Sequence, residues 1–569
     1  MKCFERRECK KTDQNLQRSK VAEKDKNERE GEQMSKRILK VVCAILTASA
    51  LLCACSISEN STETSPVSAN ASEVENSDEG NPVTSDAAAV ERPLIFRIKT
   101  EPDTLDPHKT SGTGDPQVVQ YQVFESLFRE EQDGTVVPAL ADSYEFNADG
   151  TVMTVYLRQD VFFHDGTQMT ADDVEFSINR SMSTGFNGVY VDAIQSVEKV
   201  DDFTVNINLK YAYTPIISCL SSLSTAIVPK AYVEANGDDI LARQPIGTGA
   251  YKFISWTSGT EVVFEAFEQY WRGEAAIKDL TFSVIADNNT SVIALETGEV
   301  DIDINLSNSS IPTIEANSDL KEYSGPKASM MLFSFDNQKG VFSDPRMREA
   351  VYLCVDRQAI VDSCLGGRGE VTYACMLQML DEYPDDFTVP ERNVERAKEL
   401  VAEAGYPDGV TVTAVTIDNN TYKNPTVMLQ EQLKECGINL EIELMDRAAW
   451  NEQVITNTNY EITCWAIPVT TLDADFAASK FYGPLCNGGG NFSNCNYAEI
   501  DELIEAGRVA EPGEERNEIY RQFCQEILNN YVVCPIYTST REIAANANLQ
   551  GVATSATSHY FVYDYYWSE

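Results

Sequence analysis

The chain has 569 residues, and its 89 acidic residues against 45 basic ones give a formal net charge of −44 at neutral pH. Nucleic acids and anionic lipid surfaces attract clustered Lys and Arg, so this balance argues against binding to either by charge. A chain of this length, with 43% hydrophobic residues, exceeds a single core and predicts two or three domains.

The N-terminal region predicts export. The apolar run Val41–Ala54 follows a short basic segment, and its 14 residues suit a signal peptide but are too few to span a membrane. Residues 34–54 are therefore expected to be a signal peptide. Residues 1–33 are charged and lack an apolar run, which indicates a start site assigned too early, with Met34 as the first residue. A cytoplasmic extension is the alternative.

The end of that run, LCAC, is similar to a bacterial lipobox, which predicts lipid attachment to Cys55. An ordinary cleaved signal is the alternative. The following residues, 55–92, are rich in Ser, Asn and Glu and nearly free of large apolar side chains. Such a composition cannot bury enough surface to offset chain entropy, so we expect a disordered tether.

The rest of the chain mixes strands with helices. Period-2 alternation and apolar runs predict strands over residues 94–99, 151–157, 204–209, 262–267, 280–285, 301–304, 410–416 and 440–444. Apolar spacing and cap residues predict helices that begin after Thr170 and over 290–297, 345–355 continuing toward Ile360, 393–404, 425–436, 498–508 and 514–529. The strand–helix–strand run from 410 to 444 indicates a parallel unit, so an α/β fold is expected.

Ten cysteines follow Cys55, without CxxC pairs, and the whole chain has three histidines. A metal site is therefore not expected, and no cofactor is predicted. Export permits disulfides, and the glycine-rich segment CNGGGNFSNC favours a bridge between Cys486 and Cys495. The default for the other cysteines is a buried free thiol.

Several segments taken together resemble one family. They include EPDTLDP at 101–107, LADSYEFNADGTVMTVYLRQDVFFHDGTQMTADDVEFSINR at 140–180, PIGTGAYKF at 245–253, ALETGEVD at 294–301 and FSDPRMREAVYLCVDRQAI at 342–360. In this order they are similar to the peptide/nickel-type (family 5) extracellular solute-binding proteins of ABC importers, the dipeptide- and oligopeptide-binding lipoproteins. The resemblance spans about residues 93–569.

The resemblance implies a periplasmic-binding-protein-like, two-lobed hinge fold (type II, cluster C) with an extra inserted subdomain. We expect a first lobe over 93–124, 216–330 and 536–569, an inserted subdomain over 125–215, and a second lobe over 331–535. The chain would cross between the lobes near 331–336 and 534–540. A solute held between lobes favours their closure.

The resemblance also implies ligand contacts. The loop after the LDP motif places Ser111, Gly112 and Thr113 at contact positions, and the second lobe offers Trp450 and Trp465. The residues beside the second indole, Cys464 and Ala466, are included with it. For either tryptophan, core packing is the alternative. Tyr190 and Tyr537 are further candidates, each with a structural role as the alternative.

One position departs from the family pattern. Peptide binders of this family carry an Asp three residues after the second tryptophan, whereas this chain has Pro468. Asp473 or Asp475 is a candidate substitute only if the loop folds back. Without a buried carboxylate at this place, the free amine of a peptide is not necessarily the recognised feature.

These observations predict a non-enzymatic, monomeric lipoprotein of the cell envelope, tied by lipid to the outer face of the cytoplasmic membrane, or periplasmic in a Gram-negative source. We expect it to capture a solute, with an oligopeptide as the favoured class, and to deliver it to an ABC transporter permease. An oligosaccharide or another non-peptide solute, nickel being disfavoured, and a peptide-sensing receptor remain the alternatives.

Overall fold

A computed structural model describes residues 92–110, 114–131, 134–184, 188–384, 387–469 and 471–568. The predicted signal peptide, the lipidation site Cys55, the tether as far as residue 91 and the loop residues Ser111, Gly112 and Thr113 lie outside the described residues. Within the described ranges, no helix combines the length and apolar character that crossing a bilayer requires.

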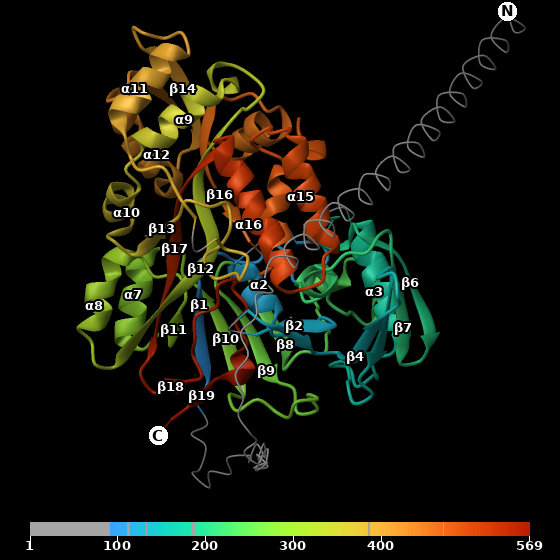
Figure 1. Ribbon diagram of the computed structural model, residues 1–569. Helices are drawn as coiled ribbons and strands as arrows, with labels where there is room; N and C mark the ends of the chain where they lie inside the picture. The colour runs from blue at the N-terminus through green and yellow to red at the C-terminus, as the bar shows by residue number, and fades with distance from the viewer. Residues whose placement is uncertain are drawn as a thin grey trace, which may run out of the picture. The chain divides into compact units, whose positions relative to one another are not determined.

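An 11-stranded mixed sheet forms the centre of the molecule (Figure 1). Its strands run in the order β15-β14-β16-β12-β17-β11-β1-β10-β9-β8, and β13 pairs separately with β17. Their bounds are β1 Leu94–Ile98, β8 Tyr251–Thr257, β9 Glu261–Ala266, β10 Asp279–Val284, β11 Ile302–Asp303, β12 Leu320–Phe335, β13 Gly369–Val371, β14 Val410–Ile417, β15 Ile438–Met445, β16 Ile462–Pro468 and β17 Val533–Asn546.

The two longest strands of this sheet, β12 and β17, lie side by side and antiparallel (Figure 1). Their pairing runs from Leu320 opposite Asn546 to Ser334 opposite Val533. The register shifts between Pro326 and Met330, and a register shift of this kind locally bends and twists a strand pair. These strands therefore connect the two halves of the sheet through a discontinuous ladder.

Smaller sheets lie outside this one. Strands β4, β5, β7 and β6 form a four-stranded antiparallel sheet, and two further sheets have two strands each. Their bounds are β2 Phe128–Glu130, β3 Val136–Pro138, β4 Ala141–Phe146, β5 Val152–Leu157, β6 Ile194–Asp201, β7 Thr204–Leu209, β18 Leu549–Gln550 and β19 Tyr566–Trp567.

The helices follow the expected cap chemistry in several places. At the start of α3 (Ala171–Ser183), a side-chain oxygen of Asp173 accepts the Thr170 backbone N–H at 2.9 Å, and α7 (Asn288–Thr297) ends at left-handed Gly298. The other α-helices are α2 Asp115–Gln120, α4 Gly188–Val191, α5 Ile216–Cys219, α6 Lys230–Asn236, α8 Ile311–Glu315, α9 Pro345–Cys354, α10 Arg357–Leu365, α11 Val394–Glu403, α12 Asn420–Lys434, α13 Arg447–Trp450, α14 Ala474–Ala478, α15 Ala498–Val509 and α16 Glu514–Asn529.

Two predicted helices differ from those observed. The helix expected to run from 345 toward 360 ends at Cys354, and α10 begins separately because the Asp356 side chain accepts the Ala359 N–H as a new N-cap. The helix expected from 425 begins five residues earlier, after the N-cap Asn419. Pro425 lies in the second turn of this helix, where its missing N–H removes one regular bond to the carbonyl four residues earlier.

Buried apolar side chains form four large clusters and a small one. One cluster draws on residues 94–124, 223–304 and 543–565, and a second on residues 127–227. The other two large clusters cover opposite faces of the β14–β16–β12 region and draw on residues 328–556 and 331–537. Alternation along β16 decides which face each of its side chains joins: Trp465 and Ile467 lie in one cluster, Ile462 and Cys464 in the other.

Candidate solute-binding site

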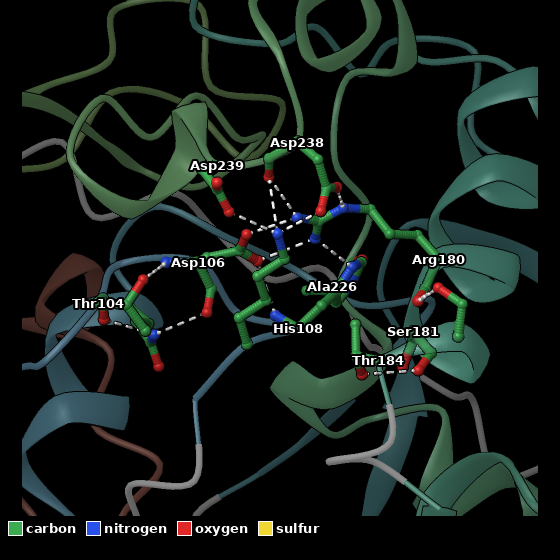
Figure 2. Close-up of polar contacts among 12 residues, drawn as sticks. Thr104, Asp106, His108, Arg180, Ser181, Thr184, Ala226, Asp238 and Asp239 are labelled. Atoms are coloured by element: carbon green, nitrogen blue, oxygen red, sulfur yellow. Dashed lines mark hydrogen bonds and ion pairs between the residues drawn. The ribbon is translucent and has the colours of Figure 1, made fainter.

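The segment leading to residues 111–113 is held by a buried ion pair. Arg180 on α3 reaches Asp106 through two contacts, from Nη2 to Oδ2 at 2.5 Å and from Nη1 to Oδ1 at 2.9 Å (Figure 2). The same guanidinium binds Asp238 through Nε at 2.7 Å. The Asp106 side chain is fully buried and that of Arg180 is 5% exposed, so water screens this contact little. The network ties the segment rigidly to α3.

His108 completes this network. Its Nε2 lies 2.8 Å from the carbonyl oxygen of Ala226, and its Nδ1 lies 3.0 Å from Nη1 of Arg180 (Figure 2). Burial, followed by the charge of Arg180, lowers the pKa of His108 to about 4. The ring is therefore neutral at physiological pH, with Nε2 as donor to Ala226 and Nδ1 as acceptor from Arg180.

The far side of the same loop is fixed at Asp115. Its Oδ2 accepts the backbone N–H groups of Lys99 and Thr100 at 2.6 and 3.0 Å, and its Oδ1 accepts Nδ2 of Asn305 at 2.7 Å. The described residues on both sides of 111–113 are thus anchored by buried or half-buried hydrogen bonds.

On β16, Trp465 contacts Phe492 with ring centroids 4.3 Å apart and is 4% exposed. Its indole Nε1 is buried and has no hydrogen-bond partner among the described residues. A buried donor without an acceptor costs about 1–3 kcal/mol. An acceptor on a bound solute would remove that cost, so Trp465 keeps the properties of a contact residue.

Trp450 differs from Trp465. It is 1% exposed, and its Nε1 donates to Thr463 Oγ1 at 3.0 Å, while that hydroxyl donates to the Val415 carbonyl at 2.7 Å. Its indole has no unmet hydrogen bond and is enclosed by the core. For Trp450, the structure favours the packing role that the sequence left as an alternative.

The backbone of β16 offers a second kind of contact. Val469 N–H donates to Ala328 O at 2.9 Å, so the peptide groups of Val469 and of every second residue before it on β16 face β12. By alternation, the peptide groups of Cys464 and Ala466 face away from β12. On that other side β14 pairs with β16 at Ile462 and Thr463 alone, so the strand beyond Thr463 has no strand partner there among the described residues.

Three other candidates have structural partners. Asp473 caps α14 and forms an ion pair with Arg516 at 2.7 Å, so its carboxylate is already compensated. Tyr537 is 3% exposed in the same cluster as Cys464, whose side chain points to the face opposite Trp465. Tyr190 is 9% exposed and stacks on Phe476 with centroids 6.1 Å apart.

A cavity of about 340 Å³ lies near Tyr190, between residues 188–219 and residues 471–508. Its walls include Asp473 together with the ion pair of Asp475 and Arg508, whose Oδ1 and Nε atoms are 2.8 Å apart. Tyr213, from the first of these two segments, donates from its hydroxyl to Oδ2 of Asp475, in the second, at 3.2 Å. The contact joins segments far apart in the sequence.

The predicted Cys486–Cys495 disulfide is wrong in this structure, where all ten described cysteines are free. Cys486 Sγ lies 3.1 Å from the carbonyl oxygen of Cys495, and Cys495 Sγ lies 3.1 Å from the carbonyl oxygen of Phe481. Each thiol is directed at a backbone carbonyl, so the glycine-rich loop closes through hydrogen bonds.

Sequence reasoning missed Arg180 and Phe492. Arg180 closes the segment quoted for the resemblance and carries a charge on a largely buried stretch of helix, which was a usable signal. Phe492 lies 27 residues after Trp465 in an irregular segment, and no local pattern connects the two rings.

Two long strands crossing between separate cores, with an anchored loop on one side and an indole beside an open strand on the other, define a two-lobed solute-binding protein. The comparisons with known proteins identify the kind. Residues 135–489, more than half of the chain, match the model of bacterial extracellular solute-binding proteins, family 5 Middle. The chain belongs to the family 5 extracellular solute-binding proteins.

Among its relatives, the oligopeptide-binding protein AppA of Bacillus subtilis (strain 168) is 27% identical over 76% of this chain and 84% of its own. The glutathione-binding protein GsiB of Salmonella paratyphi A is 27% identical over 79% of this chain and 89% of its own. The solved structure of AppA in complex with a nonapeptide superimposes with a TM-score of 0.72 and 25% identity, covering 84% of this chain and 99% of that one.

Proposed function

We propose that this protein binds oligopeptides between its two lobes and delivers them to the permease of an ABC transporter. The observation that carries the proposal is the part of β16 beyond Thr463, where open peptide groups lie beside the unpartnered indole of Trp465. An extended peptide adds to such an edge as a further strand, with main-chain hydrogen bonds for affinity and side-chain contacts for selectivity. Relatives that bind an oligopeptide and glutathione support this solute class.

The proposed lobes keep the predicted division into 93–124, 216–330 and 536–569, an inserted 125–215, and 331–535. Separate apolar clusters support it, because each large cluster draws almost entirely on one part. The register shift between Pro326 and Met330 favours a hinge within β12, slightly before the predicted crossing. A solute that touches both lobes would then favour closure.

We also propose that lipid on Cys55 holds the protein at the outer face of the membrane, with 55–92 as the tether. Since a single acyl chain gives only marginal anchoring, the two or more chains of a bacterial lipoprotein would be needed. Radiolabelled palmitate should enter the wild-type protein and not the Cys55→Ala variant when each is expressed in a bacterial host. Equal labelling of both would contradict the proposal.

Native mass spectrometry of the purified chain beginning at residue 93 tests the solute class directly. A ladder of co-purifying masses spaced by amino-acid residues is expected. The bound pool, released by mild denaturation and added back to stripped protein, should raise the melting temperature. A ladder spaced by hexoses would contradict the peptide proposal and favour the oligosaccharide alternative.

Transport and sensing differ in what happens after binding. Cells expressing the protein with its permease should accumulate a labelled peptide, and loss of the protein should abolish that uptake. Unchanged uptake in its absence, with a change in gene expression on peptide addition, would favour a receptor.

A further inference from the structure

Two cations on the crossing strands have no acidic partner in the part of the chain that the structure describes. Lys327 on β12 forms no hydrogen bond or ion pair among the described residues, and Arg541 on β17 forms no ion pair there. Arg541 pairs in register with Gly325, two residues before Lys327, so the two positions are close along the ladder. In a chain with twice as many acids as bases, an uncompensated pair of cations is an unusual arrangement.

The residue next to Lys327 contacts two separate segments of the candidate site. Its neighbour Ala328 donates its N–H to Ala556 O at 2.9 Å and accepts the N–H of Val469 at 2.9 Å. Val469 directly follows β16, the strand of Trp465. Lys327 therefore stands where the second-lobe wall meets the C-terminal segment that packs on the first lobe.

Arg541 connects to the anchored loop. Its Nη2 donates to Ser558 Oγ at 2.7 Å, and its Nε is buried without a hydrogen-bond partner. Both Arg541 and Asp115 influence the pKa of Tyr560, which burial raises, so all three lie in one neighbourhood. Asp115 is the residue that fixes the far end of the loop 111–113.

Lys327 is exposed, yet the protein around it and the charge of Arg541 lower its pKa to about 8. Two cations near each other repel, and an anion bound between them relieves that repulsion.

Resting on the proposed function, we infer that Lys327 and Arg541 hold a carboxylate of the bound peptide. The inference rests on two uncompensated cations that lie close together, where β12 and β17 contact the segment after β16 and the C-terminal segment. Lys327 would supply a point charge, and Arg541 its unpartnered Nε–H. The carboxylate comes either from the C-terminus of the peptide or from an acidic side chain.

Three synthetic mixtures of tri- to pentapeptides distinguish these sources. The first contains free acids without Asp or Glu, the second the same sequences as C-terminal amides, and the third amides with one Glu. Binding is measured by native mass spectrometry and calorimetry on the wild type, Lys327→Met and, as the matched control, Lys321→Met. Lys321 is also an exposed lysine of β12, six residues earlier, opposite Ala545.

We expect the wild type to bind the free acids at least about tenfold more tightly than the amides, since a charge-assisted contact contributes about 1.5–3 kcal/mol. Lys327→Met should remove this preference and Lys321→Met should keep it. Tight binding of the Glu-containing amides, lost in Lys327→Met, would support the inference with a side-chain carboxylate as the source.

Equal binding of all three mixtures, or a preference unchanged in Lys327→Met, would overturn the inference and leave the proposed function standing. Failure of every mixture to bind the wild type would overturn both. Arg541→Lys gives a second reading, because it keeps the charge and removes the Nε donor: a preference reduced but present is expected, and an unchanged one contradicts the role given to Nε.

Discussion

The two walls of the candidate site are built by opposite physical means. The segment 105–110 is held by charged groups in a buried setting, where Asp106 and His108 contact Arg180 of α3. The β16 wall rests on apolar packing, and Nε1 of Trp465 is left without a partner there among the described residues. One wall thus has its polar groups satisfied before a ligand arrives, while the other keeps an unmet group for the ligand.

This difference predicts which substitutions change stability and affinity together and which change only one of them. Residues of the ionic wall should affect folding and binding together, because removing one charge leaves another buried and unpaired. Residues of the apolar wall should allow the two effects to be measured apart. The following predictions test that contrast, from the largest expected effect to the smallest.

Arg180→Met should have the largest effect. It leaves Asp106 buried without its cation, which costs about 3–5 kcal/mol and frees the segment 105–110, so stability and peptide binding should fall together. Urea unfolding and calorimetry measure both. Arg396→Met removes an exposed pair with Glu403 and serves as the control, with no measurable change expected. Wild-type stability in Arg180→Met would refute the ionic account of this wall.

Acid should weaken the ionic wall through His108. Because burial lowers its folded-state pKa from 6.5 to about 4, the unfolded chain binds a proton that the folded chain does not between these values. The stabilisation is complete above pH 6.5 and falls by up to about 3 kcal/mol as the pH approaches 4. His164, whose pKa burial also lowers to about 4, adds a similar loss.

The measurement is the free energy of unfolding in urea between pH 7 and pH 4. His108→Gln should show a shallower decline than the wild type over this window, whatever its stability at pH 7. Parallel curves for the two proteins would show that His108 does not contribute to the acid sensitivity.

The apolar wall is tested by a matched pair of substitutions. Trp465→Phe removes an unpartnered donor and should weaken peptide binding by about 1 kcal/mol, or roughly fivefold. Stability should stay nearly unchanged, because the relief of the unmet donor offsets the packing lost with the smaller ring. Trp450→Phe removes the bond to Thr463 Oγ1 and should lower stability by about 1 kcal/mol with little effect on affinity. Chemical denaturation measures the stability of each variant, and calorimetry measures its affinity. A loss of affinity in Trp450→Phe and of stability in Trp465→Phe would contradict the roles given to these indoles.

The smallest effect concerns the contact between Tyr190 and Phe476. A double-mutant cycle with Tyr190→Leu and Phe476→Leu should give a coupling energy of about 0.5–1 kcal/mol, typical of stacked aromatic pairs. If the contact forms on closure, the coupling appears in the peptide-bound protein and is smaller without peptide. A coupling of zero in both states would remove this pair from the closure mechanism.

The sequence determined much of the fold because local signals are strong where period and caps agree. The strand over 204–209 and the helix over 514–529 were predicted with the observed bounds, and the helix over 290–297 ends at Gly298 as predicted. The family resemblance, confirmed by the family match, supplied the order of the two-lobed arrangement. The bounds of these strands and helices depend on residues a few positions apart, so one segment contains the needed information.

The tertiary structure alone decided which polar groups meet. Asp106 and Arg180 are 74 residues apart, and only the packing of α3 against the loop brings them together in a buried setting. The unlike hydrogen bonding of the two indoles follows from the position of one hydroxyl, that of Thr463, beside Trp450. Hydrogen bonds and desolvation act over a few ångströms in space, and sequence distance carries little information about them.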